Sequence, residues 1–219
     1  MSIEKKLTKI KKTLPEHVTL VAVSKTKPNS DLQEAYDAGQ RVFGENKVQE
    51  MTRKWEELPK DIQWHMIGHV QRNKVKYMAS FVSLIHGVDS LKLLKEINKQ
   101  GKKNDRKISC LLQVHIAEEE TKFGFDENEL VEMIQDQAFL ELKNIEVQGL
   151  MGMATFTDDK NQVKKEFNTL HNLFQKLKSN LDGLKILSMG MSGDYQIAIA
   201  EGSNMVRIGS SIFGARNYS

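Results

Sequence analysis

The sequence predicts an α/β protein folded as a single (β/α)8 barrel. Eight short apolar runs alternate with segments of helical spacing along the 219 residues. Strands that alternate with helices require parallel pairing and crossover connections. Eight such units fit a closed TIM barrel, and an open doubly wound sheet is the alternative. No composition break or long linker divides the chain, so we expect one domain over residues 1–219.

Composition narrows the class of protein. Hydrophobic residues make up 39% of the chain, enough for a sizeable core, and the formal net charge is only +3. Because the lysines are dispersed and no nucleic-acid motif is present, we expect no nucleic-acid partner. The single cysteine, Cys110, excludes an internal disulfide and fits a reducing compartment. No bilayer-spanning run and no signal peptide are evident, so we expect a cytoplasmic protein that does not bind membranes.

The elements follow in order. An amphipathic helix over residues 1–14 with a basic face ends at Pro15 and precedes the first strand, which begins at Val18. Seven further strands are expected at residues 41–43, 62–67, 81–85, 108–116, 145–151, 185–189 and 205–208. Helices are expected at residues 31–38 and 47–58, as a short piece from residue 71, and at 90–100, 126–138, 163–177 and 195–200. Ser30 is the expected N-cap of the first of these, and Asp89 or Ser90 caps the fourth.

Lys25 ends the first strand, within the run VTLVAVSKTKP. In barrels of this kind the active site lies at the C-terminal ends of the strands. Burial there would lower the pKa of the amine and make it a nucleophile toward an aldehyde, with which it forms a Schiff base. The alternative is a lysine that reaches solvent just past the strand.

Glycine and serine follow the seventh and eighth strands, as Gly190-Met191-Ser192-Gly193 and Gly209-Ser210-Ser211. These two loops form the recurrent phosphate site of the fold, because glycine lets backbone N–H groups approach an anion and serine adds a hydroxyl. The alternative is a pair of tight, capped turns.

Arg207 lies within the last strand and cannot shed its charge, so it must face a partner. That partner is either a carboxylate, such as Glu201 or Asp194, or a ligand. A lysine amine, a phosphate cradle and an arginine together suggest pyridoxal 5′-phosphate (PLP): its aldehyde meets Lys25, its ring nitrogen Arg207, and its 3′-oxygen Asn46.

Several segments resemble the pyridoxal phosphate homeostasis protein family, whose bacterial members are called YggS-like and whose human relative is the proline synthetase co-transcribed homologue. The segments are VAVSKTKP, FGEN with VQE after it, WHMIG with QRNK after it, GLMGMAT, LSMGMSGD and MVRIGSSIFGAR. They span about residues 18–216, nearly the whole chain, in the expected order.

The resemblance implies a barrel like the N-terminal domain of alanine racemase, with a Schiff-base lysine at Lys25. It also implies phosphate contacts in the loops that carry Met191, Ser192, Gly209 and Ser210, with Arg207 facing the pyridine nitrogen. Many relatives have a proline where this chain has His69, so no role is assigned to His69. His65 and His69 are four residues apart, but Gly68 and the strand pattern argue against a metal pair, and we expect no metal.

Two function classes remain open. One is a non-enzymatic carrier that stores, buffers or delivers PLP, with PLP-dependent apoenzymes as its expected recipients. The other is a fold-type III PLP enzyme such as an amino-acid racemase, which needs a second acid or base opposite Lys25. The chain offers no candidate for that group and no second domain, so we favour a monomeric carrier without catalytic residues. A Schiff-base aldolase ranks behind both.

Overall fold

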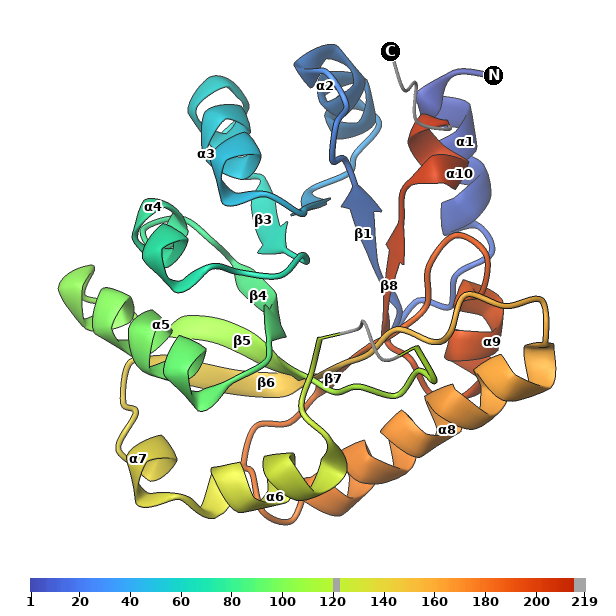
Figure 1. Cartoon of the computed structure of the whole chain (residues 1–219). Helices are drawn as coiled ribbons and strands as arrows, with labels where there is room; N and C mark the ends of the chain where they lie inside the picture. The colour runs from blue at the N-terminus through green and yellow to red at the C-terminus, as the bar shows by residue number, and fades with distance from the viewer. Residues whose placement is uncertain (120–122, 215–219) are drawn as a thin grey trace.

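The computed structural model describes residues 1–119 and 123–214 and confirms the (β/α)8 barrel. The strands pair in parallel in chain order, and β8 pairs with β1 to close the barrel (Figure 1). The strands are β1 (Thr19–Val23), β2 (Val42–Glu45), β3 (Gln63–Met66), β4 (Leu84–Val88), β5 (Ile108–Gln113), β6 (Ile145–Met151), β7 (Ile186–Ser188) and β8 (Met205–Ile208).

Helices surround this barrel and cover the outer face of the strands (Figure 1). They are α1 (Ile3–Lys11), α2 (Asn29–Asp37), α3 (Val48–Glu57), the 3-10 turn η1 (Arg72–Lys74), α4 (Val75–Met78), α5 (Leu91–Lys103), α6 (Glu127–Gln135), α7 (Gln137–Leu140), α8 (Lys160–Leu177), α9 (Tyr195–Ala200) and α10 (Ser210–Phe213). Helix α1 precedes the barrel and packs against α10.

The core has two layers because alternate strand residues point to opposite faces. The large layer lies between strands and helices and includes Leu20 and Ala22 of β1. The small layer fills the barrel and includes Val21 of β1, Leu84 of β4 and Met205 of β8. Burial of both faces explains why the strands read as continuous apolar runs rather than as alternating ones.

The fourth strand lies three residues later than predicted, at Leu84–Val88 instead of 81–85. Phe81 and Val82 donate their backbone N–H groups to the Met78 carbonyl, so this apolar pair belongs to the turn after α4. The Phe81 ring also stacks on Trp55 of α3, with centroids 4.4 Å apart. His86, which directly follows the predicted strand in the sequence, is therefore buried inside β4.

Two helix predictions also need correction. Ser30 does not cap its helix, because α2 already begins at Asn29, directly after the extended Pro28. The helix expected over residues 126–138 is divided at Asp136, whose extended backbone ends α6 while its side chain caps α7. The expected cap at Ser90 is confirmed by its bond from the Leu93 N–H.

Candidate cofactor-binding site

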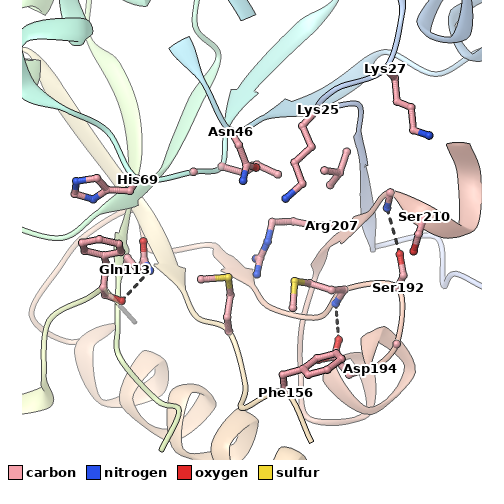
Figure 2. Close-up of a pocket in the computed structure, with 18 of the residues that line it drawn as sticks. Lys25, Lys27, Asn46, His69, Gln113, Phe156, Ser192, Asp194, Arg207 and Ser210 are labelled. Atoms are coloured by element: carbon pink, nitrogen blue, oxygen red, sulfur yellow. Dashed lines mark hydrogen bonds between the residues drawn. The ribbon is translucent and has the colours of Figure 1, made fainter. Parts of the chain in front are cut away.

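A cavity of about 620 Å³ opens where the strands end. Every residue that the sequence assigned to a cofactor lines it: Lys25, Asn46, Met191, Ser192, Arg207, Gly209 and Ser210. Figure 2 shows the amine of Lys25 pointing into the cavity, with Asn46 beside it and Arg207 nearby. Residues contributed by β1, β2, β7 and β8 and the loops after them thus meet in one space.

The loops after β7 and β8 contact each other at one end of this cavity. The Gly209 N–H donates to Ser192 Oγ at 3.3 Å, and the Met191 N–H donates to Asp194 Oδ1 at 2.5 Å. Within the described part of the chain, the N–H groups of Ser192, Gly193 and Ser210 donate to no protein acceptor. Unpaired backbone donors that line a cavity are suited to an anion.

Arg207 is buried on β8 and makes hydrogen bonds to uncharged groups. Its Nη1 donates to Ser188 O at 2.9 Å and to Ser188 Oγ at 2.6 Å, and its Nη2 donates to Gly152 O at 3.0 Å. Burial lowers the pKa of Arg207 to about 10, so the guanidinium stays charged at neutral pH. Among residues 1–119 and 123–214, three of its five N–H donors have an acceptor, which leaves two for a ligand.

Two buried histidines continue from Arg207 into the barrel. His86 Nδ1 lies 3.0 Å from Ser188 Oγ, and His86 Nε2 lies 3.0 Å from His65 Nδ1. The Ser188 hydroxyl accepts from Arg207 and, with a second lone pair and one proton, can either donate to or accept from His86 Nδ1. Burial lowers the pKa of both histidines, so uncharged rings lie behind Arg207.

Acid should destabilise the protein through these histidines. Burial lowers the pKa of His65 to about 3 and that of His86 well below 6.5. Between the folded and unfolded values only the unfolded chain binds the protons, so the free energy of unfolding falls as the pH drops below 6.5. We expect about 1.4 kcal/mol per pH unit for each histidine. Urea unfolding at a series of pH values measures this slope.

The variant His65→Gln/His86→Gln is the control for that slope, because glutamine does not titrate. Its stability should change much less with pH across the same range. A wild-type protein whose stability is flat between neutral pH and pH 5 would contradict the prediction.

Aromatic side chains that the sequence analysis did not single out border the cavity. Phe156, after β6, is 96% exposed, and the Phe123 ring, after β5, stacks on His69 with centroids 4.1 Å apart. His69 Nδ1 also lies 2.9 Å from Asp89 Oδ2. A signal for Phe156 was available: it is a lone aromatic residue in a polar loop.

Neither a metal site nor a membrane span emerges from the part of the chain that the structure describes. No cluster of three or more histidine, cysteine or acidic side chains occurs among residues 1–119 and 123–214. No helix within the same ranges has the length and apolar character to cross a membrane.

The fold and the cavity define a class of protein. The family model described as alanine racemase, N-terminal domain, matches residues 1–217, the whole of this parallel barrel. Within it, the chain is 41% identical over 201 residues to the pyridoxal phosphate homeostasis protein of Aquifex aeolicus, covering 91% of this chain and 87% of that one. The chain belongs to the pyridoxal phosphate homeostasis protein family.

Solved structures agree with this assignment. PipY of Synechococcus elongatus with PLP bound superposes with a TM-score of 0.89 at 34% identity, covering 97% of this chain and 100% of PipY. An alanine racemase of Clostridium difficile superposes with a TM-score of 0.77 at 17% identity, covering all of this chain and 56% of that one. The second likeness shows the fold alone.

Proposed function

We propose that this protein binds PLP in the cavity and serves PLP homeostasis by storing, buffering or delivering it. The observation that carries the proposal is the convergence of three kinds of group in one space. These are the amine of Lys25, the charged guanidinium of Arg207, and the N–H groups of Ser192, Gly193 and Ser210, which have no acceptor among the described residues.

The residues present fit this cofactor. The two loops would hold the phosphate, because their free N–H groups and hydroxyls donate to an anion. One of the remaining donors of Arg207 would bond the ring nitrogen, which has a single lone pair, and the Asn46 side chain would bond the 3′-oxygen. The cofactor supplies an aldehyde, to whose carbon the Lys25 nitrogen bonds with loss of one water molecule.

Relatives support the proposal independently. PipY, which is 34% identical to this chain, has been solved with PLP bound. Curated relatives at 38–41% identity carry the name pyridoxal phosphate homeostasis protein. The direct test is a difference spectrum of the purified, dialysed protein on addition of PLP, followed by mixing with the apo form of a PLP enzyme. A saturable new band and recovery of the recipient's activity are expected, and a spectrum identical to that of free PLP would contradict the proposal.

A negative charge in the phosphate cradle should weaken binding. Ser210→Asp places a carboxylate next to the anion, and like charges in close contact are strongly unfavourable. We expect the Kd for pyridoxine 5′-phosphate, which lacks the aldehyde, to rise at least about tenfold, or about 1.4 kcal/mol. Calorimetric titration measures this.

Ser211→Asp is the matched control, since Ser211 carries the same side chain one residue further on and does not line the cavity. Its Kd should change by less than about threefold. Equal losses in both variants would show that net charge, rather than the cradle, governs binding.

We propose a carrier rather than an enzyme. Racemisation needs a second acid or base opposite Lys25. No tyrosine lines the cavity among the described residues, and the His69 ring is held between Asp89 and Phe123. Chiral analysis of free amino acids incubated with the PLP-loaded protein should show no turnover near the typical enzyme value of ~10 per second.

We also propose that the protein works as a cytoplasmic monomer. The buried free thiol of Cys110 suits a reducing compartment. All the groups assigned to the cofactor come from one chain, so no partner subunit is needed to complete the site. Light scattering of the purified protein tests the monomeric state and should give the mass of one chain.

A further inference from the structure

A buried lysine lies behind the loop that carries Lys25. Lys54 of α3 is only 1% exposed, and its Nζ donates to three acceptors, each at 2.8 Å. They are the Ser24 carbonyl, Glu45 Oε1 at the end of β2, and Glu50 Oε1 one turn earlier on α3. All three ammonium hydrogens are used, so the position of this charge is fixed.

The same cluster holds both chain neighbours of Lys25. The Ser24 hydroxyl donates to Glu45 Oε1 at 2.6 Å, while its carbonyl accepts from Lys54. On the other side, the Thr26 N–H donates to Glu50 Oε1 at 2.6 Å. Lys25 therefore stands on a backbone segment anchored on each side to one buried ionic cluster.

The backbone of Thr26 is strained, and the anchoring contacts hold it in that conformation. Its φ is +65°, in the left-handed region, where a β-branched residue is rare and strained. Such a conformation persists only where surrounding contacts hold it. The hydrogen bond from Thr26 to Glu50 is such a contact.

Stability alone is a weak reason for this cluster. Burying Lys54 and Glu45, and most of Glu50, costs desolvation that apolar side chains of similar size would not incur. Burial also raises the pKa of Glu45, in spite of the opposing effect of Lys54. This desolvation cost is understandable if the cluster fixes the backbone around Lys25 by directional hydrogen bonds, which an apolar contact could not make.

We propose that Glu50, which accepts a hydrogen bond from Lys54 of the Glu45–Lys54 ion pair, is a positioning residue that directs the Lys25 amine into the cavity. This inference rests on the proposed function, because it assumes that Lys25 reacts with the PLP aldehyde. Glu50 accepts the Thr26 N–H and so fixes the main-chain turn from which the Lys25 side chain projects.

The test compares Glu50→Ala with Glu50→Gln. Both leave Lys54 and Glu45 as a balanced pair, so neither strands a buried charge. Alanine removes the acceptor for the Thr26 N–H, whereas the glutamine carbonyl keeps it. We expect the rate of the spectral change with PLP to fall at least about tenfold in Glu50→Ala. In Glu50→Gln it should stay within about threefold of wild type.

Pyridoxine 5′-phosphate supplies the second readout, because its binding does not involve a bond to Lys25. Its Kd should stay within about twofold in Glu50→Ala, since the phosphate loops are untouched. A wild-type reaction rate in Glu50→Ala, equal slowing in Glu50→Gln, or a parallel loss of pyridoxine 5′-phosphate affinity would each overturn the proposal.

Gln40→Ala controls for general destabilisation. Gln40 is a buried polar residue near the N-terminal ends of β1 and β2, where its Nε2 donates to the Leu20 carbonyl at 2.9 Å and to the Val42 carbonyl at 2.7 Å. Its loss should lower stability but leave the PLP reaction rate within about twofold; slowing as large as in Glu50→Ala would overturn the proposal. If the proposed function itself fails, wild-type protein will bind neither PLP nor pyridoxine 5′-phosphate, which is a distinct result.

Discussion

Lys25→Ala should abolish stable retention of PLP. The variant keeps the phosphate loops and Arg207 but has no amine at the end of β1 to bond the aldehyde carbon. We expect the cofactor to be lost on gel filtration and its affinity to fall by about 100-fold or more, equivalent to about 2.7 kcal/mol. Absorbance of the protein fraction, with phosphate analysis of the same fraction, measures the retained cofactor.

Lys27→Ala is the matched control for this experiment. Lys27 also lines the cavity, but its Nζ donates to the Phe213 carbonyl at 3.0 Å. The Lys27 variant still has the Lys25 amine, so it should keep the cofactor through gel filtration. Retention by Lys25→Ala together with loss by Lys27→Ala would move the assignment to Lys27.

Gly149→Ala should cause the largest loss of stability of any single methyl addition considered. Gly149 lies in β6 between β5 and β7, and a Cβ there would stand 1.7 Å from the Ile186 carbonyl oxygen. The carbonyl oxygen belongs to the backbone and the Cβ is bonded directly to the backbone, so in a closed barrel neither atom can move without breaking strand pairing. We expect a loss of about 3 kcal/mol or more in the free energy of unfolding, measured by urea titration.

Gly193→Ala is the comparison, because a Cβ at that position has nothing within 4 Å and its backbone is not left-handed. Its free energy of unfolding should change by less than about 0.5 kcal/mol. Similar midpoints for the two variants would mean that the β6–β7 contact is looser than described.

The sequence predicted the barrel well because strand burial leaves a readable pattern. The run MVRI was expected as a strand over residues 205–208 and is one, since each of its residues is buried. Where apolar residues serve turns as well as strands, the pattern fails. Phe81 and Val82 read as strand but close the turn after α4, so β4 begins three residues later than predicted.

The sequence predicted those residues of the candidate site that lie at strand ends or in glycine- and serine-rich loops. Lys25, Arg207 and the two Gly-Ser loops all line the cavity. The cluster behind Lys25 was not predicted, because a lysine on a charged helix usually faces water. One signal was present: Lys54 falls three residues after Met51 and six after Val48, on the face of α3 that is buried.

Borohydride reduction of the PLP-loaded protein, followed by peptide mass analysis, tests whether Lys25 is the residue that holds the cofactor. Hydride adds to the carbon of the carbon–nitrogen double bond and fixes the cofactor to whichever lysine holds it. The account predicts one cofactor mass per chain, on the peptide that contains Lys25. A label found on another lysine, or spread among many, would contradict it.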